Sequence, residues 1–368
     1  MSEVKTVDRI VPVGNPLQAV RRAFARNLRD RAFVKAVASQ TTVTEVKGDG
    51  FRDVTGDYLI SGDRGVHAVV GGRLLRLSGT RTFGIAVRDG ILYCAASDDR
   101  YSSICRAALP AVLEPGKTLE FEEIQRAATS KNGRYHQIGF VGNRLAVAAT
   151  ERNAILFLNP EDGTTVAECF PFRDRFGDPV LGDHNHINSV SECGECLLFC
   201  AYKAGKHALL CVLHNDRVKA YRIDNRGAHD VYIEGRNLWH SDTFGVPAEL
   251  GGDDCGYVMK NNRRVDADFF STPPGKVVRG IAGTGEELLV GHSHKGPRSK
   301  RYEGKGSIIR LVGDKVVNET PVSFAQVYDI LRLDGRHFDE SPAFGTWEEV
   351  TTHFTSILGP CVYEQTLD

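Results

Sequence analysis

From Thr41 onward the chain consists of short apolar runs that alternate with polar positions and are separated by turn residues. A clear example is Phe83-Gly-Ile-Ala-Val, which is followed by a turn and by Leu92-Tyr-Cys-Ala-Ala. Alternation with a period of two is typical of β-strands that bury one face, and a turn between two such runs predicts a hairpin. The pattern therefore predicts an all-β domain.

This hairpin returns along the chain as a repeat of roughly fifty residues. Its first strand occurs six times, and the copies begin at Phe83, His136, His186, His229, Arg279 and Tyr328. In the first five copies a second strand follows, and then two more short strands. Four strands in a repeat of this length are typical of one blade of a β-propeller.

The sixth copy lacks its remaining strands, and strand-like runs without a first strand stand near the start of the chain. These runs are Asp57-Tyr-Leu-Ile-Ser-Gly-Asp, Gly65-Val-His-Ala-Val-Val and Arg73-Leu-Leu-Arg-Leu. One C-terminal strand and three N-terminal strands would complete the sixth blade and remove the exposed edges of an open array. The sequence thus predicts a six-bladed β-propeller that is closed by N-terminal strands.

Helical patterns occur only near the two ends of the chain. Residues 15 to 38 show a 3.6-residue period with an arginine-rich outer face, which predicts a helix that packs on its own domain rather than on a membrane or a partner. A second helix-like run begins at Thr346. We therefore expect an N-terminal helical extension (1–40), the propeller (41–335) and a short helical C-terminal extension packed on it (336–368).

Composition limits the class of protein. The 368 residues are 41% hydrophobic with a formal net charge of -1, so no overall charge points to nucleic acid or to a membrane surface. The residues near Met1 do not have the pattern expected of a signal peptide, and no run approaches the roughly 18 apolar residues of a transmembrane helix. The nine cysteines are odd in number and lie mostly in strand interiors, which favours reduced thiols. We expect a cytoplasmic protein that binds neither nucleic acid nor membrane.

In a propeller the first residues of the inner strands converge on one mouth of the central channel. Three of these six residues are histidines, namely His136, His186 and His229. Neutral imidazoles are common ligands of transition metals, and three of them leave positions open for water or substrate. The pattern predicts a divalent metal (Fe, Mn or Zn), with a metal-free polar channel as the alternative. The hairpin of the third blade is longer, so His184 or Asn188 could replace His186 in the ring.

Other residues are expected on the same face. Arg279 fits a clamp for an anionic small molecule, and Tyr328 fits an acid, a base or an oxyanion donor. A basic loop at 295–305 follows the second strand of the fifth blade. The candidate substrate contacts are Arg279, Arg298, Lys300, His292 and His294; candidate supports for the metal ligands are Asp183, His184, Asn188, His240, Asp242 and Glu151. A homo-oligomer is left open.

Over residues 41 to 335 the repeat resembles six-bladed β-propellers. The histidine ring is similar to that of metal-dependent propeller enzymes such as oligogalacturonate lyases and carotenoid oxygenases, but those have seven blades and a fuller ligand set, which argues against membership. The phrase His229-Asp-Val with Leu238-Trp-His-Ser-Asp-Thr-Phe is similar to one in uncharacterised bacterial propeller proteins. The resemblance implies a metal-dependent lyase, isomerase, hydrolase or oxygenase. The alternative is a non-catalytic propeller that binds a peptide or protein on this face.

Overall fold

The computed structural model describes residues 40–47, 50–98, 100–128, 135–202, 207–223, 227–245, 255–270, 276–296 and 300–367. The chain divides into two units, Met1–Ala36 and Val37–Asp368, and every element named below belongs to the second unit. The helix predicted at 15–38 lies outside the described residues. The predicted boundaries at 40 and 335 stay predictions.

Six antiparallel sheets, here called blades, make up this unit, and the first three follow one another along the chain. Blade one contains β6 (Thr82–Arg88), β7 (Ile91–Ser97), β8 (Tyr101–Ala108) and β10 (Glu122–Ala128). Blade two contains β11 (Tyr135–Val141), β12 (Arg144–Ala149), β13 (Ala154–Leu158) and β14 (Thr165–Cys169). Blade three contains β15 (Ile187–Cys193), β16 (Cys196–Ala201), β17 (Ala208–His214) and β18 (Arg217–Ile223), with β28 (Cys361–Thr366) added outside.

The other three blades complete the set. Blade four contains β19 (Ala228–Glu234), β20 (Asn237–Asp242), β21 (Tyr257–Lys260) and β22 (Arg263–Arg264). Blade five contains β23 (Lys276–Thr284), β24 (Glu287–His294), β25 (Ser307–Val312) and β26 (Lys315–Pro321). Blade six contains β27 (Val327–Arg332), β3 (Tyr58–Gly62), β4 (Gly65–Val70), β5 (Arg73–Arg76) and β2 (Thr44–Val46). A separate two-stranded sheet joins β1 (Gln40–Thr42) to β9 (Thr118–Glu120).

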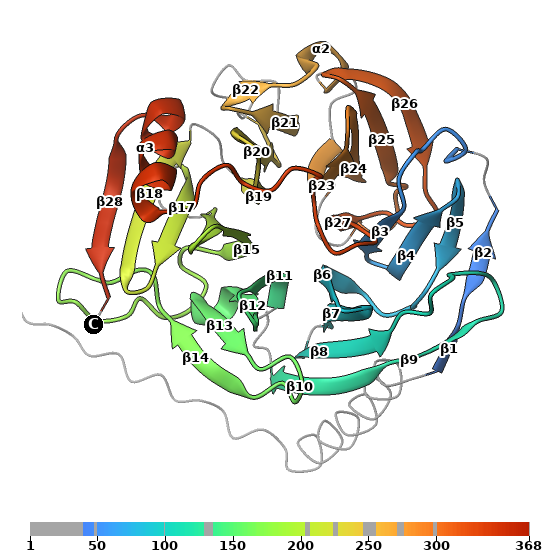
Figure 1. Ribbon diagram of the computed structural model, residues 1–368, viewed down its shortest axis with the longest axis horizontal. Coiled ribbons are helices and arrows are strands. Elements are labelled where there is room, and N and C mark those ends of the chain that lie inside the picture. Colours follow the sequence, from blue (N-terminus) through green and yellow to red (C-terminus); the bar gives the residue numbers. More distant parts are fainter. Residues whose placement is uncertain are drawn as a thin grey trace, which may run out of the picture. The chain divides into compact units, whose positions relative to one another are not determined.

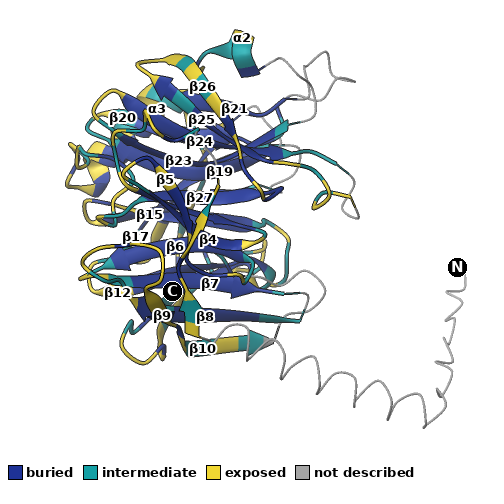
Figure 2. Ribbon diagram, turned by 90° about the vertical axis from the view of Figure 1, so that its right-hand side faces the viewer, coloured by how far each residue is buried: buried dark blue, intermediate teal, exposed yellow. Residues whose placement is uncertain are grey.

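The blades form a closed ring around a central channel. Each inner strand contacts the inner strand of the next blade, in the order β6, β11, β15, β19, β23, β27 and back to β6 (Figure 1). Most residues of the inner and second strands are buried, although β11 is only partly so, and most exposed residues lie in loops and outer strands (Figure 2). The six-bladed β-propeller predicted from the repeat is confirmed.

Blade six closes the ring as the sequence predicts. Its inner strand β27 comes from the C-terminal part of the chain and pairs with β3, with Ile330 opposite Ile60, and β4 and β5 follow outward. The outermost strand β2, which pairs with β5, was not expected. Blade six therefore combines one strand from the C-terminal part of the chain with four strands from its N-terminal part.

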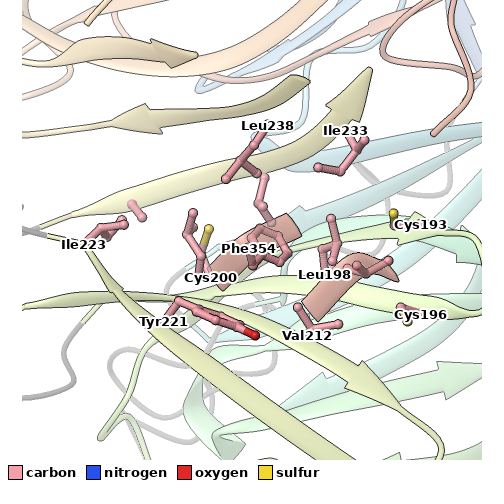
Figure 3. Close-up of a cluster of buried hydrophobic side chains, with 14 of the residues drawn as sticks. Cys193, Cys196, Leu198, Cys200, Val212, Tyr221, Ile223, Ile233, Leu238 and Phe354 are labelled. Carbon is pink, nitrogen blue, oxygen red and sulfur yellow. The ribbon is translucent and has the colours of Figure 1, made fainter. Parts of the chain in front are cut away.

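The C-terminal extension differs from the purely helical one that the sequence predicts. Helix α3 (Trp347–Leu358) begins with a capping box between Thr346 and Glu349, and the chain then forms strand β28 on the outer edge of blade three. Helix α3 contacts β17 and β18, and its Phe354 lies in a buried cluster with Cys200, Tyr221 and Leu238 (Figure 3). The extension thus fastens the end of the chain to blade three.

All nine cysteines are free thiols, and seven of them are buried. Short connecting helices are η1 (Thr150–Arg152) and α2 (Ala267–Phe270). Among the described residues, no helix has the length and apolar character needed to cross a membrane.

Candidate functional site

A β-bulge near the start of each inner strand sets the geometry of the channel. The pairing of inner and second strands shifts by one residue there in all six blades. A bulge places two residues opposite one and re-aims their side chains. Beyond the bulge the register is shared: Ile85, Ile138, Val190, Val231, Ile281 and Ile330 face equivalent residues of the second strands.

This register identifies the ring residue that the sequence left open in blade three. Counting back two residues from the shared positions gives Phe83, His136, Asn188, His229, Arg279 and Tyr328. Asn188, not His186, is therefore the structural equivalent of the other ring residues. Its side-chain amide is buried and donates a hydrogen bond of 2.9 Å to the carbonyl oxygen of Ala228.

His186 nevertheless reaches the same mouth from the loop before β15. Its backbone is in the left-handed region, with φ 53°, and its ring centroid lies 5.2 Å from that of His136. Its Nδ1 lies 2.7 Å from an Asp183 carboxylate oxygen, a contact that fixes the orientation of this imidazole.

The structure brings the predicted ring residues into one cluster of aromatic side chains. The Phe83 ring lies 4.5 Å from that of Tyr328 and 5.2 Å from that of His136, and the His136 ring lies 6.5 Å from that of His229. The guanidinium carbon of Arg279 lies 6.0 Å from the centroid of the Tyr328 ring. Residues from five blades thus meet at one mouth of the channel.

Tyr202 also belongs to this cluster, although sequence reasoning did not select it. Its ring lies 4.9 Å from that of His186 and 6.3 Å from that of His229. A signal was present, because Tyr202 directly follows the second strand of blade three. The same position, just after a second strand, makes Glu151 a candidate in blade two.

Two buried polar atoms at this mouth have no hydrogen-bond partner among the described residues. His229 is hydrogen-bonded through Nδ1 to the Thr243 hydroxyl at 2.7 Å, but its Nε2 is buried without a hydrogen bond. The Nε of Arg279 is likewise buried and unpaired. Burial, and next the charge of Arg279, hold the pKa of His229 well below its usual range. The His229 imidazole is therefore neutral and can act as a ligand or an acceptor.

The three imidazoles match a shared metal ion only in part. Metal–nitrogen bonds of about 2.1 Å would place the ring centroids about 5 Å apart. The pair His136 and His186 meets this spacing at 5.2 Å, whereas His136 and His229 are 6.5 Å apart. Among the described residues, no group of three or more His, Cys, Asp or Glu side chains is arranged to hold a metal. His229 would have to move inward to complete such a site.

Deeper in the channel lies a polar network that sequence reasoning missed. The Gln137 amide nitrogen lies 2.7 Å from a carboxylate oxygen of Asp230, 3.0 Å from one of Asp329 and 2.7 Å from the Tyr232 hydroxyl. The second oxygen of Asp230 accepts hydrogen bonds from Ser241 and from the backbone of Gly280. Burial, and next the nearby Asp329 carboxylate, raise the pKa of Asp230 to about 7.

The remaining predicted residues include both buried and exposed side chains. Tyr328 is buried, and burial raises the pKa of its phenol well above its usual range. His292 is buried with its Nδ1 3.3 Å from a Glu319 carboxylate oxygen on outer strand β26. His294 accepts a bond to its backbone oxygen from Gln326, and Lys300 is exposed, as is His184. Arg298 lies outside the described residues.

Three further supporting candidates have their own local partners or environments. His240 is fully buried in β20, where burial lowers its pKa to about 4 and neither ring nitrogen has a hydrogen-bond partner in the described part of the chain. Asp242 accepts a hydrogen bond of 2.9 Å from the backbone of Gly245. Glu151 lies in η1, directly after the second strand of blade two. Their predicted roles beside a metal stay predictions.

Fold and site together define a six-bladed β-propeller with a histidine- and arginine-lined channel mouth. No family model matches the chain, and no curated protein matches it in sequence. Solved structures similar to it include a chain of a nidogen/laminin complex, at 11% identity over 74% of this chain and 97% of that one, with a TM-score of 0.49.

Two other similar structures come from Bacteroides species. A protein of unknown function from Bacteroides caccae has 11% identity over 75% of this chain and 98% of its own, with a TM-score of 0.47. A proposed 6-phosphogluconolactonase from Bacteroides uniformis has 12% identity over 77% of this chain and 99% of its own, with a TM-score of 0.45. At such identities the likeness concerns the fold alone.

Proposed function

We propose that the mouth formed by His136, His186, His229 and Arg279 binds an anionic small molecule and that the three imidazoles hold a divalent transition metal (Fe, Mn or Zn) there. The observation that carries the proposal is the pair of buried, unpaired nitrogens on His229 and Arg279. Leaving such an atom buried without a partner costs about 1–3 kcal/mol. A bound ligand would satisfy both nitrogens.

The residues of this mouth have complementary roles in the proposal. Arg279 offers a fixed charge and a planar set of donors to a carboxylate or phosphate group. Asp183 holds the His186 ring and Thr243 the His229 ring, so the direction of each lone pair is set in advance. A metal bound there would polarise a substrate oxygen or lower the pKa of a bound water. The reaction, whether elimination, isomerisation, hydrolysis or oxidation, is left open.

Metal analysis tests the proposal directly. The chain is purified without an affinity tag, and the bound transition metal is measured in the native protein and in the double variant His136→Ala/His229→Ala. We expect close to one equivalent in the native protein and a loss of most of it in the variant. His214→Gln is the matched control, because the His214 imidazole lies on blade three beside Glu195, away from the His136 and His229 rings. Less than about 0.1 equivalent in the native protein would refute a metal site.

A metal-free anion site is the second candidate, and the 6.5 Å separation of the His136 and His229 rings favours it. Calorimetric titration with citrate, before and after chelator treatment, separates the two. Binding that survives chelation and is lost in Arg279→Leu would support the metal-free site. Absence of both metal and citrate binding would refute both candidates and favour the peptide- or protein-binding propeller.

The nine free thiols support a reducing compartment, and we propose that the protein acts in the cytoplasm.

A further inference from the structure

We infer a second small-molecule site at the opposite mouth of the channel, one that fits an organic amine with an apolar body. The inner strands carry the histidine cluster at their first residues, and their last residues surround a separate pocket of about 440 Å³. His136 and Phe140, at the two ends of β11, are separated by about 13 Å along the strand. The inference does not rest on the proposed function of the first mouth.

The pocket has the size and the construction of a ligand site. Small-molecule pockets have volumes of about 300–1,000 Å³ and mainly apolar walls with a few polar groups. The walls here come from the inner strands of blades one, two, three, four and six. One side is formed by residues 334–342, which belong to the segment that runs from β27 to α3 (Figure 1). Elements distant in sequence thus build a single concave surface.

The walls of the pocket are aliphatic and aromatic. Ile138, Val190 and Ile233 line it from three blades, and Phe140 and Phe338 contribute aromatic rings. Tyr232 and His337 stack on each other with ring centroids 3.8 Å apart. Such walls accept the apolar body of a ligand and exclude water from it.

Two buried carboxylates stand behind the stacked rings. The Tyr232 hydroxyl lies 3.5 Å and the His337 Nε2 3.6 Å from an oxygen of Asp329, and Gln137 joins Asp329 to Asp230. This network thus places the Asp329 carboxylate directly behind the stacked rings.

The charged residues at the rim are unbalanced. Four carboxylates line the pocket, on Asp89, Glu192, Asp334 and Glu340, against the two cations Arg88 and Arg336. Both arginines are already engaged. The guanidinium of Arg88 lies 3.9 Å from the centroid of the Phe140 ring and donates to the carbonyl oxygen of Gly142. That of Arg336 pairs with Asp334 at 2.8 Å.

Three of the four carboxylates therefore lack an ion-pair partner among the described residues, and four carboxylates against two arginines leave an excess of two negative charges. Within the described part of the chain, Asp89, Glu192 and Glu340 form no ion pair, and Glu192 accepts only a backbone hydrogen bond from Gly142. Like charges gathered around a concave apolar surface attract a counter-charge and repel an anion. An ammonium group on an aromatic or aliphatic body matches both the charge and the walls. The two mouths of the channel thus differ in the sign of the ligand they favour.

The experiment compares three probes of one shape. The full-length chain is titrated, with ligand-observed NMR as readout, against 3-phenylpropylamine, 3-phenylpropanol and 3-phenylpropionate. We expect the amine to bind about tenfold more tightly than the alcohol and the carboxylate to bind most weakly. Raising the salt concentration should weaken the binding of the amine but not that of the other two probes.

Variants locate the site. Glu192→Gln/Glu340→Gln should weaken amine binding about fivefold and leave the alcohol unchanged. Ser341→Trp, at an exposed position on the rim, should fill the pocket and abolish binding of both. Asp314→Asn is the control, because this exposed carboxylate pairs with Lys260 outside the pocket, and melting curves confirm that each variant folds. The inference is overturned by equal binding of the three probes, by tighter binding of the carboxylate, by an unchanged Glu192→Gln/Glu340→Gln variant, or by no saturable amine binding up to about 10 mM.

Discussion

Replacing Asp230 by asparagine should flatten the dependence of stability on pH. Asp230 is fully buried between Gln137, Ser241 and the backbone of Gly280, and its pKa is raised from 3.8 to about 7. Its φ of 53° lies in the left-handed region, which asparagine tolerates better than most residues. The new amide nitrogen would face Gln137, whose own amide oxygen is unpaired and can turn to accept from it. The substitution therefore removes the ionisable group with little change of shape.

The size of the effect follows from the two pKa values. Because the folded protein binds this proton more tightly than the unfolded chain, the stabilisation linked to the proton is complete below the unfolded value of about 4. It is lost as the pH rises through the folded value of about 7. Between pH 5 and pH 8 the native protein should lose up to about 3 kcal/mol from this group alone. The variant lacks that loss.

Urea denaturation at pH 5, 6, 7 and 8 measures the effect. We expect the native protein to lose stability relative to Asp230→Asn over this range, while other titrating groups contribute equally to both. Asp314→Asn, which removes an exposed carboxylate paired with Lys260, should follow the native protein. Parallel curves for the native protein and Asp230→Asn would refute the reasoning, because they would show that the burial of Asp230 carries no linked cost.

Four further substitutions test the packing of the inner strands and of helix α3. Gly84→Ala should destabilise by about 3 kcal/mol, because the added methyl carbon would lie 2.5 Å from the Cα of Gln137; Gly90→Ala meets no atom within 4 Å and should cost only about 1 kcal/mol from its φ of 72°. Equal denaturation midpoints for the two would contradict this steric reason. Thr346→Ala removes the capping box of α3 and should lower the free energy of unfolding by about 1 kcal/mol, measured by thermal melting. An unchanged melting temperature would show that the cap does not stabilise the protein. Tyr221→Phe removes a 3.0 Å hydrogen bond to the Thr351 carbonyl oxygen. The free energy of the opening that permits hydrogen exchange in α3 should fall by about 1 kcal/mol, so exchange there should be faster.

The blades could be predicted from sequence because alternation is local and repeats. Each copy carries the same succession of apolar positions, so the strands of an unclear copy can be located by aligning it with the other copies. Strand β28 had no such support. Its residues are only partly buried on one face and exposed on the other, and its partner β18 lies more than a hundred residues earlier in the chain. A half-exposed edge strand without a copy elsewhere gives a weak pattern.

The convergence of the candidate site could be predicted in outline for the same reason. Ring positions such as His136 and His229 follow from the shared phase of the repeats, but the choice between His186 and Asn188 needed the actual strand pairing. Asp230 and Asp329 were missed because they directly follow ring residues. In a regular strand neighbouring side chains point to opposite faces. The bulges break that rule, and the sequence shows no sign of them.

The attachment of β28 to blade three also bears on how the chain folds during synthesis. Blades one, two, four and five are made of continuous sequence and can form as they leave the ribosome. Blade six must wait for β27, and blade three is completed only by residues 361–366. An emerging chain therefore keeps blade three incomplete until residues 361–366 have been synthesised, and a loss of these residues would leave the outer edge of β18 exposed in an otherwise closed ring.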